Sequence, residues 1–273
     1  MSKELPNLAL IGFGEAGLTF ARAGHWGEAG RAFDVDEARR PLMAECGIEV
    51  AQTAWEALAG AQIVLSLVTA ESALEVAQEC AQYLGKGAVW CDMNSVAPGT
   101  KREAAKAIEA AGGQYVDVAV MAPVDPARLD VPLLLSGTEA EQALELLNRL
   151  GFGNKRIVGA DVGRASAIKM IRSIMVKGIE ALTWECAAAA EEAGVFEEVM
   201  ASLDASEKQV PWAGKTAYNR ERMETHGLRR AAEMEEVAKT LLDLGIEPVM
   251  TRGTVALQRR AAEKNEDERT RAA

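Results

Sequence analysis

The sequence predicts an α/β protein: a doubly wound, mainly parallel sheet in residues 1–160, followed by a smaller all-helical domain in residues 161–273. Two observations indicate this. Through the first part, short apolar runs alternate with Ala- and Glu-rich segments of helical spacing, which is typical of a parallel sheet covered by helices on both faces. After Gly159 the apolar runs stop, and long stretches rich in Ala, Glu and Arg follow.

Six apolar runs, each short and bounded by turn residues, are predicted to be buried parallel strands. They span residues 8–13, 31–34, 63–68, 88–93, 115–121 and 132–135. Segments with helical spacing, such as 71–84 and 99–111, lie between them. Open sheets of this kind bind ligands beyond the carboxyl ends of their strands, so we expect functional residues just after these runs.

The second part begins with a predicted long helix. Residues 161–193 contain no proline and no strand-like run, and a helix of about 30 residues would be roughly 45 Å long. Further helices are expected after it, with breaks at Pro211, Gly227 and Gly245. The charged C-terminal tail is expected to fray.

Composition excludes several classes of protein. Lys and Arg total 30 against 41 Asp and Glu, a formal net charge of −11, which argues against broad contact with nucleic acid or anionic membranes. The sequence shows no signal peptide and no run of 18 apolar residues, so we expect a cytoplasmic protein. Four scattered cysteines without a CxxC pair predict small buried hydrophobes, with no metal site and no disulfide framework.

The segment IGFGEAG carries a G-x-G-x-x-G motif directly after the first apolar run. The first glycine permits a tight turn, the second lets the backbone approach a pyrophosphate, and the third allows the following helix to pack against the strand. The N-terminus of that helix would face the anion. The motif therefore predicts a Rossmann-type dinucleotide-binding domain, whose contacts are expected from Gly12, Phe13, Gly14, Glu15, Ala16 and Gly17.

Asp34 bears on the choice of dinucleotide. It lies about 20 positions after the glycines, where the motif predicts an acidic residue at the end of the second strand. A carboxylate there accepts hydrogen bonds from the ribose hydroxyls of NAD and repels the 2′-phosphate of NADP. NAD is therefore the favoured cofactor, while the nearby Arg39 and Arg40 keep NADP open as the alternative.

The long predicted helix has a cationic stripe opposite an apolar face. At roughly 100° per residue, Lys169, Ser173 and Lys177 fall near 0°, 40° and 80°, with Arg172 near −60°. The opposite arc holds the apolar side chains Ile171, Ile174, Met175, Ile179 and Leu182. A solvated charged face would be the simpler interpretation. We favour a functional one, because the cations gather at the domain junction of an acidic chain.

Lys169 has a chemical role in this interpretation. When hydride leaves an alcohol carbon for nicotinamide, the hydroxyl proton must pass to a base. A free lysine has a pKa near 10.4, and partial burial with neighbouring cations such as Arg172 and Lys177 would lower it toward neutral pH. The same cations would attract a small anionic substrate bearing a carboxylate, sulfonate or phosphate.

Four blocks, in order, resemble the β-hydroxyacid dehydrogenase family, which includes 3-hydroxyisobutyrate dehydrogenase and 6-phosphogluconate dehydrogenase. The first is the glycine turn. The second, CDMNSVAPGT, is similar to the family's D-x-S-T-x-x-P segment, and the third, YVDVAVMAP, aligns with its D-A-P-V-S-G-G substrate loop. The fourth, residues 163–173, is similar to G-x-G-x-x-x-K-x-x-N-N and places Lys169 on the family's catalytic lysine.

The resemblance implies a dehydrogenase acting on a CH–OH group, with Lys169 as general acid and base. It implies cofactor contacts at Val68, Thr69 and Asn94 and a substrate contact at Ser95. Two departures concern the substrate. Met121, Ala122 and Pro123 stand where the family has Ser-Gly-Gly, and Arg172 and Ser173 stand where it has paired asparagines. With Lys177, these positions complete the predicted substrate-binding set. In sum, the fold and cofactor follow the family more closely than the substrate does.

Two other functions compete with this one. An imine reductase would share the fold and the cofactor, but the lysine position usually carries another residue there, so Lys169 favours alcohol chemistry. A non-catalytic dinucleotide-binding regulator would explain the altered substrate loop, yet it would leave the cationic stripe without a purpose.

A homodimer is expected, because the apolar arc of the long helix needs a cover; helices of the same chain are the alternative cover. His226 is interpreted as a surface or capping residue, or as a residue that reaches the cleft together with Arg229, from the same chain or from a dimer partner. Trp212 is interpreted as a core aromatic, or as a pocket wall.

Overall fold

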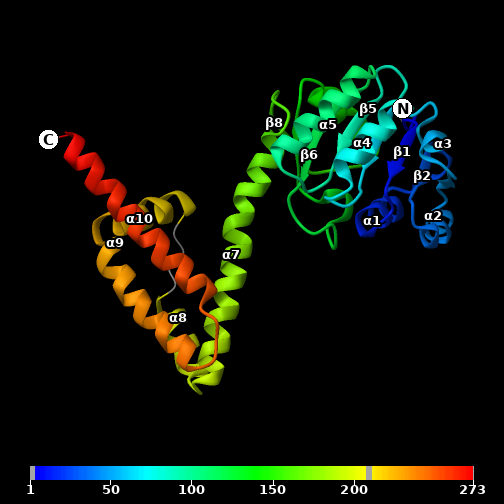
Figure 1. Cartoon of the computed structure of the whole chain (residues 1–273). Coiled ribbons are helices and arrows are strands. Elements are labelled where there is room, and N and C mark those ends of the chain that lie inside the picture. Colours follow the sequence, from blue (N-terminus) through cyan, green and yellow to red (C-terminus); the bar gives the residue numbers. More distant parts are fainter. Residues whose placement is uncertain (1–3, 207–210, 273) are drawn as a thin grey trace. The chain divides into compact units, whose positions relative to one another are not determined.

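A computed structural model describes residues 4–206 and 211–272. For residues 174, 177, 180, 181, 212, 213, 232, 233, 235–237, 239, 240, 243 and 264–272 it describes the backbone alone. The chain forms two compact units, Met1–Ser173 and Ile174–Ala273 (Figure 1). The first unit contains the sheet, and the second is helical.

An eight-stranded sheet forms the centre of the first unit, in the order β3-β2-β1-β4-β5-β6-β7-β8. Neighbouring strands from β3 to β6 are parallel, β7 is antiparallel to β6, and β8 is parallel to β7. The strands are β1 (Leu8–Ile11), β2 (Gly30–Phe33), β3 (Glu49–Val50), β4 (Ile63–Ser66), β5 (Val89–Asp92), β6 (Gln114–Val120), β7 (Leu133–Ser136) and β8 (Lys155–Gly159). The predicted α/β class with a mainly parallel sheet is therefore confirmed.

Alternating side chains along the strands explain why helices cover both faces of the sheet. In β1, Leu8 and Leu10 belong to one buried cluster, while Ala9 and Ile11 belong to the other. The first cluster packs under α1, α2 and α6, and the second under α3, α4 and α5. These helices are α1 (Glu15–Gly24), α2 (Arg40–Glu45), α3 (Ala54–Leu58), α4 (Ala73–Ala81), α5 (Pro98–Ala110) and α6 (Ala140–Arg149).

Three short 3-10 helices, η1 (Gly27–Ala29), η2 (Glu37–Arg39) and η3 (Arg128–Asp130), lie in the connections. Each of the six predicted runs overlaps a strand, but the prediction of a parallel strand at 132–135 is wrong beside β6, since β7 runs antiparallel to it. The strands β3 and β8 were not predicted, since β3 has only two residues and β8 carries the charged pair Lys155 and Arg156.

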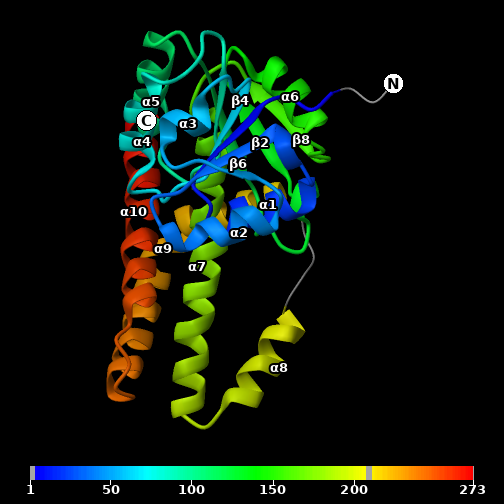
Figure 2. The same ribbon diagram turned by 90° about the vertical axis from the view of Figure 1, so that its right-hand side faces the viewer.

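The helical unit begins within the long helix α7 (Arg164–Glu192). It contains α8 (Phe196–Ser206), α9 (Trp212–Asp243) and α10 (Val249–Ala272), and α9 and α10 lie side by side (Figures 1 and 2). The predicted break at Gly227 is wrong, because α9 continues through it. A Cβ at Gly227 would lie 2.3 Å from the carbonyl oxygen of Gln258, so this glycine permits the close approach of α10.

Glu185 fastens the beginning of α10 to α7. Its Oε1 accepts hydrogen bonds from the backbone N–H and the hydroxyl of Thr251, at 3.0 and 2.7 Å, and its Oε2 accepts one from the Met250 N–H at 2.8 Å. Burial alone would raise the pKa of this carboxyl, but the hydrogen bonds outweigh burial and lower its pKa below that of an ordinary glutamate. The ionised form of Glu185 therefore stabilises the helical unit.

The first turns of α7 belong to the sheet unit. The sheet ends with β8 at Gly159, close to the boundary predicted at residue 160, whereas the compact units divide after Ser173. Ala165 and Ser166 at the start of α7 are buried, and Ala165 packs against residues of β6 and β7. Lys169 and Arg172 therefore lie in the same unit as the sheet.

Two of the four cysteines, Cys80 and Cys91, are buried as predicted, but Cys186 is exposed on α7. Among the residues that the structure describes, no helix is both long and apolar enough to cross a membrane. The described residues also contain no cluster of His, Cys, Asp and Glu side chains able to hold a metal ion.

Candidate active site

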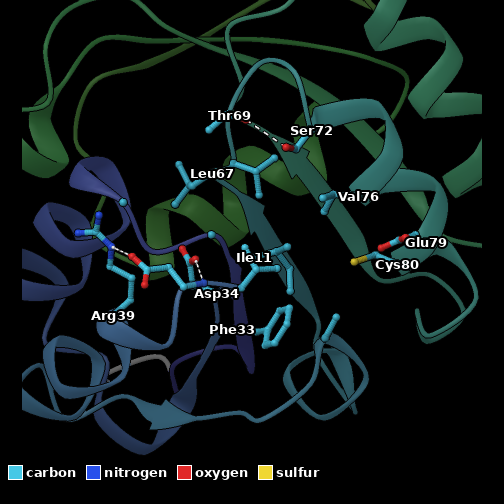
Figure 3. A pocket seen from close by; sticks show the side chains of 16 residues that line it. Ile11, Phe33, Asp34, Arg39, Leu67, Thr69, Ser72, Val76, Glu79 and Cys80 are labelled. Carbon is cyan, nitrogen blue, oxygen red and sulfur yellow. Dashed lines mark hydrogen bonds and ion pairs between the residues drawn. The ribbon is translucent and has the colours of Figure 1, made fainter.

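A pocket of about 390 Å³ lies at the carboxyl ends of three adjacent parallel strands. Gly12 and Gly14 follow β1, Asp34 follows β2, and Val68 and Thr69 follow β4. Figure 3 shows Asp34 and Arg39 on one side of this pocket and Glu79 and Cys80 on the other. The strand order changes direction between β1 and β4, which is the point where open sheets of this kind bind their ligands.

The glycine turn is closely packed on one side and open on the other. Gly12 has a φ of +92°, and a Cβ there would lie 2.6 Å from the carbonyl oxygen of Leu67. A Cβ at Gly17 would lie 2.9 Å from the Gly12 carbonyl oxygen, so α1 packs directly on the turn. At Gly14 a Cβ would meet nothing within 4 Å. The open space lies at the N-cap of α1, where no side chain satisfies the helix N–H groups.

Asp34 is held by two backbone N–H groups. Its Oδ2 accepts a hydrogen bond from Phe13 at 2.6 Å, and its Oδ1 accepts one from Asp36 at 2.8 Å. Each carboxylate oxygen keeps acceptor capacity for a ligand. The Phe13 side chain is buried in the core, so only its backbone belongs to the turn. Glu15 is exposed and Ala16 half-buried in the first turn of α1.

The residues present fit an NAD(P) dinucleotide. The space at Gly14 and the uncapped N-terminus of α1 suit a diphosphate, because helix N–H groups and the helix dipole attract anions. Asp34 lies where the motif places an acceptor for ribose hydroxyls.

The pocket also contains a thiol. Cys80 lines it from α4, and burial, with a smaller contribution from the charge of Glu79, raises the pKa of Cys80 to about 12. At neutral pH this side chain is therefore an uncharged, weakly reactive wall of the pocket.

Lys169 and Ser95 meet at the same edge of the sheet. Lys169 on α7 donates a hydrogen bond from Nζ to the Ser95 hydroxyl oxygen at 2.6 Å. Ser95 is exposed in the turn that follows β5, the strand next to β4, and Lys169 is half-buried. The two residues are 74 positions apart in sequence, and the fold brings their polar atoms into contact.

The other predicted substrate residues lie around this pair. Arg172 is exposed, with its Nη1 3.4 Å from the Met121 carbonyl oxygen, and Ala122 and Pro123 are exposed in the loop after β6. The Ser173 hydroxyl donates to the Lys169 carbonyl oxygen at 3.0 Å, so it bonds to its own helix.

The interpretations of three residues in the helical part stay predictions. The side chains of Lys177 and Trp212 lie outside the described residues. His226 is exposed on α9, in the helical unit.

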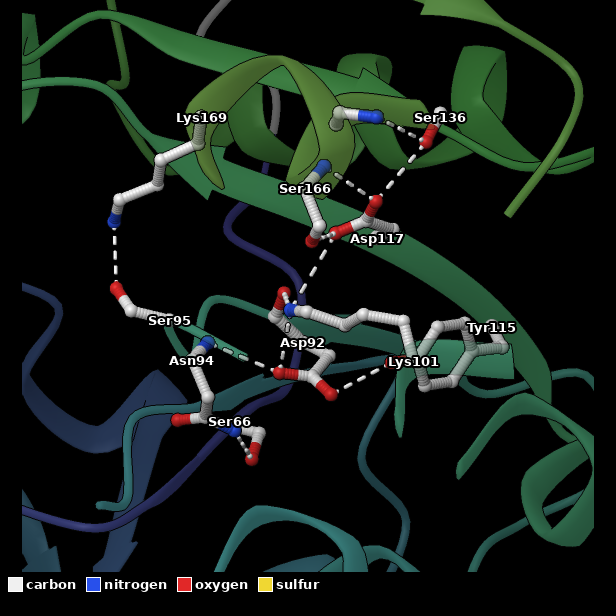
Figure 4. A network of polar contacts seen from close by, with 11 residues as sticks. Ser66, Asp92, Asn94, Ser95, Lys101, Tyr115, Asp117, Ser136, Ser166 and Lys169 are labelled. Carbon is white, nitrogen blue, oxygen red and sulfur yellow. Dashed lines mark hydrogen bonds and ion pairs between the residues drawn. The ribbon is translucent and has the colours of Figure 1, made fainter. Parts of the chain in front are cut away.

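A buried polar network, which sequence reasoning missed, lies beneath the pair (Figure 4). Lys101 of α5 is fully buried and donates from Nζ to the carbonyl oxygen and to the Oδ1 of Asp92, at 2.6 and 2.8 Å. The same ammonium lies 3.4 Å from Oδ1 of Asp117 on β6. Tyr115 donates its hydroxyl proton to Asp92 Oδ2 at 2.6 Å, and burial raises the pKa of this phenol.

The network extends to both elements that carry the pair. The Ser166 hydroxyl and backbone N–H donate to Asp117 at 2.6 and 2.9 Å, next to the beginning of α7. The Asn94 backbone N–H donates to Asp92 Oδ1 at 3.0 Å, directly before Ser95. The Asn94 amide nitrogen donates to Ser66 at 2.9 Å, and its buried Oδ1 accepts no hydrogen bond from the described residues. Carboxylates inside two predicted buried strands were the available signal, since a buried charge requires a partner.

Comparison with known proteins places the chain in a family. Residues 7–157, more than half of the chain, match the NAD binding domain of 6-phosphogluconate dehydrogenase, and residues 190–261 match a domain of unknown function, DUF1932. An uncharacterised 28.5 kDa protein of Methanothermus fervidus is 27% identical over 223 residues, which cover 80% of this chain and 83% of that protein.

Solved structures agree with the match. A conserved hypothetical protein from Sinorhizobium meliloti is 37% identical, with a TM-score of 0.64, over 96% of this chain and 90% of its own. A conserved protein of unknown function, described as structurally similar to 3-hydroxyacid dehydrogenases, is 29% identical, with a TM-score of 0.62, over 94% of this chain and 98% of its own.

Imine reductases share the fold at lower identity. The Myxococcus stipitatus enzyme has been solved with NADP+ and, as a variant, with NAD+, at 21% and 22% identity and a TM-score of 0.77 in both cases; each comparison covers 95% or more of both chains. The resemblance found in the sequence is confirmed. The chain belongs to the family defined by the NAD-binding domain of 6-phosphogluconate dehydrogenase, and it joins an NAD(P)-binding Rossmann domain to a helical domain of unknown function.

Proposed function

We propose that the protein is an NAD-dependent oxidoreductase that transfers a hydride between the cofactor and the CH–OH group of a small anionic hydroxy acid. The observation that carries the proposal is the Lys169–Ser95 contact at 2.6 Å, at the sheet edge that also bears the dinucleotide pocket. A lysine amine and a serine hydroxyl at this place can hold the oxygen of a reacting alcohol between them.

Each side chain of the site has a separate role in the proposed reaction. When bound, NAD+ supplies the hydride acceptor. Lys169 takes the hydroxyl proton as the carbinol carbon becomes a carbonyl, and returns it in the reverse direction. Ser95 orients the substrate oxygen, and the exposed Arg172 attracts the substrate's anionic group. Hydride and proton together account for the two hydrogens removed from the alcohol.

The charge of the pocket supports NAD over NADP. Three carboxylates, from Asp34, Asp36 and Glu79, line it together with one guanidinium, from Arg39. That guanidinium is already engaged, since its Nε lies 3.2 Å from Asp36 Oδ2. Arg40 is likewise paired with Glu37, at 2.9 Å. A 2′-phosphate would therefore meet net negative charge.

A fluorescence titration with NADH and, in parallel, NADPH tests the cofactor. We expect tight binding of NADH and weak binding of NADPH, and we expect Asp34→Asn to reduce the difference. Preference for NADPH in the unmodified protein would overturn the charge argument and shift attention to Arg39 and Arg40.

A panel of small hydroxy acids with NAD+ tests the reaction, with NADH formation followed by absorbance. Lys169→Ala should abolish turnover and leave NADH affinity nearly unchanged, whereas loss of both would indicate a structural role. Lys106→Ala is the matched control, since this exposed lysine pairs only locally, with Glu103 at 2.7 Å. Reduction of imines without any hydroxy acid turnover would replace the proposal with imine chemistry, and binding without any turnover would favour a regulator.

We also propose that the protein acts as a homodimer, with a second copy covering the apolar arc of α7. Ile171, Met175, Ile179 and Leu182 are 67%, 49%, 45% and 46% exposed. Their spacing forms one stripe along the helix, which fits the apolar stripe of another helix. Light scattering should give a dimeric mass that Met175→Glu reduces to a monomeric one. Trp184→Glu, at an exposed position on the opposite side of the same helix, is the control.

A further inference from the structure

Lys101, Asp92 and Asp117 form a buried centre, and none of the three lines the pocket. Lys101 and Asp117 are 0% exposed and Asp92 is 1% exposed. Replacing such an ion pair by apolar side chains of similar volume is often neutral or stabilising in proteins, so stability alone is a weak reason for its presence. Positional specificity is the better-supported use of a fully bonded buried polar group.

The hydrogen bonds of this centre lead to both members of the Lys169–Ser95 pair. On one side, Asp92 receives the Asn94 N–H at 3.0 Å, one residue before Ser95. On the other side, Asp117 receives the Ser166 hydroxyl at 2.6 Å, and Ser166 precedes Lys169 by three residues on α7. The Lys101 ammonium joins the two carboxylates, at 2.8 and 3.4 Å.

The start of α7 receives a second attachment from the same carboxylate. Ser136 on β7 donates its hydroxyl proton to Asp117 Oδ2 at 3.2 Å and accepts the Ala165 N–H at 3.0 Å. Asp117 thus binds the helix directly through Ser166 and indirectly through Ser136. Figure 4 shows the centre lying between the Ser95 turn and the first turns of α7.

We propose that Lys101, Asp92 and Asp117 are positioning residues that set the distance between the Lys169 amine and the Ser95 hydroxyl. The proposal rests on the proposed function, because it treats this pair as the reacting groups. The centre fixes the strand-end turn that carries one group and the helix that carries the other. A defect in the centre therefore separates the pair without touching substrate or cofactor.

A thiol at position 95 measures this distance without substrate or cofactor. In the reporter variant Ser95→Cys, the neighbouring Lys169 ammonium should lower the pKa of the introduced thiol by about one unit or more below its usual value near 8.5. That shift increases the thiolate fraction at pH 7 about tenfold. The pH midpoint of iodoacetamide labelling is read by tandem mass spectrometry, which assigns the label to position 95 and distinguishes it from the buried Cys91 four residues earlier.

Two substitutions, each added to the reporter variant, distinguish a change in the position of the pair from a direct electrostatic effect on the thiol. Asp117→Asn, added to the reporter, removes a negative charge, which by Coulomb interaction alone would lower the pKa of the thiol further. If Asp117 positions the pair, the pKa rises instead. Ser166→Ala removes the 2.6 Å hydrogen bond without a charge change, and we expect a rise there too. Lys106→Met, on the same helix as Lys101, should leave the midpoint at its lowered value.

A rise of about half a unit or more in Asp117→Asn and in Ser166→Ala, with the control unchanged, supports the proposal. An unchanged or lower midpoint in folded protein overturns it, and so does an ordinary midpoint in the reporter alone. If Asp117→Asn does not fold, Ser166→Ala decides. A protein that binds neither NADH nor NADPH but gives the expected midpoints would refute the proposed function and leave the positioning role standing.

Discussion

Replacing Gly14 by alanine should weaken dinucleotide binding while leaving the fold almost as stable as before. In the structure a Cβ at Gly14 meets nothing within 4 Å, and its backbone is extended, with φ −72° and ψ −157°. If the diphosphate of the cofactor occupies this open space, the added methyl group destabilises the complex with the cofactor but not the free protein.

Opposing contributions to folding stability nearly cancel at Gly14. Restricting the unfolded chain stabilises the protein by about 0.4–1 kcal/mol, and exchanging glycine for alanine at a helix N-cap costs up to about 1 kcal/mol. The net change is within about 1 kcal/mol, or roughly 2–4 °C in Tm. In the complex, overpacking against the phosphate costs about 1–3 kcal/mol, which corresponds to NADH binding about 5- to 150-fold weaker.

Gly12→Ala is the contrasting variant. Its φ of +92° strains any non-glycine residue by about 1–3 kcal/mol. The new Cβ would also lie 2.6 Å from the Leu67 carbonyl oxygen, a backbone atom that cannot rotate away. We therefore expect a loss of about 3 kcal/mol or more, seen as a Tm lower by roughly 6–12 °C.

Thermal melts and NADH fluorescence titrations of both variants check these values. The reasoning fails if Gly14→Ala binds NADH as tightly as the unmodified protein, because the diphosphate then does not occupy the open space. It also fails if Gly14→Ala melts as low as Gly12→Ala, since the turn would then be closed on both sides.

Three further predictions concern single side chains. Iodoacetamide at pH 8 should label the exposed Cys186 well before Cys80, whose pKa is raised to about 12 by burial; equal labelling rates in peptide mass spectrometry would contradict this. The folded pKa of Glu185 is lowered below that of an ordinary glutamate, so its carboxylate adds stability above the ordinary pKa that is lost as the pH falls through the folded value; the Tm gap between the protein and Glu185→Gln should close in acid, and a gap independent of pH would count against the assignment. Leu10→Ala, in the fully buried centre of β1, should cost about 2–5 kcal/mol in denaturant unfolding, and a cost below 1 kcal/mol would show that the site is loosely packed.

Much of the fold could be predicted because its signals are local. Each buried strand is an apolar run of its own, and the glycine turn and Asp34 lie within about one strand–helix–strand unit. Gly227 misled the prediction because glycine ends helices and also lets them pack closely. The sequence alone does not separate these uses, whereas the 2.3 Å approach of Gln258 does.

The candidate site was less accessible to sequence reasoning. Ser95 and Lys169 were singled out separately, and only the fold shows that they touch. The buried centre was missed because Lys101 and Asp117 lie on different elements, and Ser166 is 49 residues beyond Asp117. Because Asp92 and Asp117 lie inside apolar strands, the sequence indicates that their carboxylates need partners. It does not show which residues these partners are.

The two strands that escaped prediction, β3 and β8, are the outer strands of the sheet. A long apolar outer strand would offer unpaired N–H and C=O groups to any other chain and promote aggregation. Here the outer strand β3 is two residues long, and its Glu49 is paired with Arg31 at 3.0 Å. The outer strand β8 carries Lys155 and Arg156. The polar residues of these two strands thus protect the protein from pairing edge to edge.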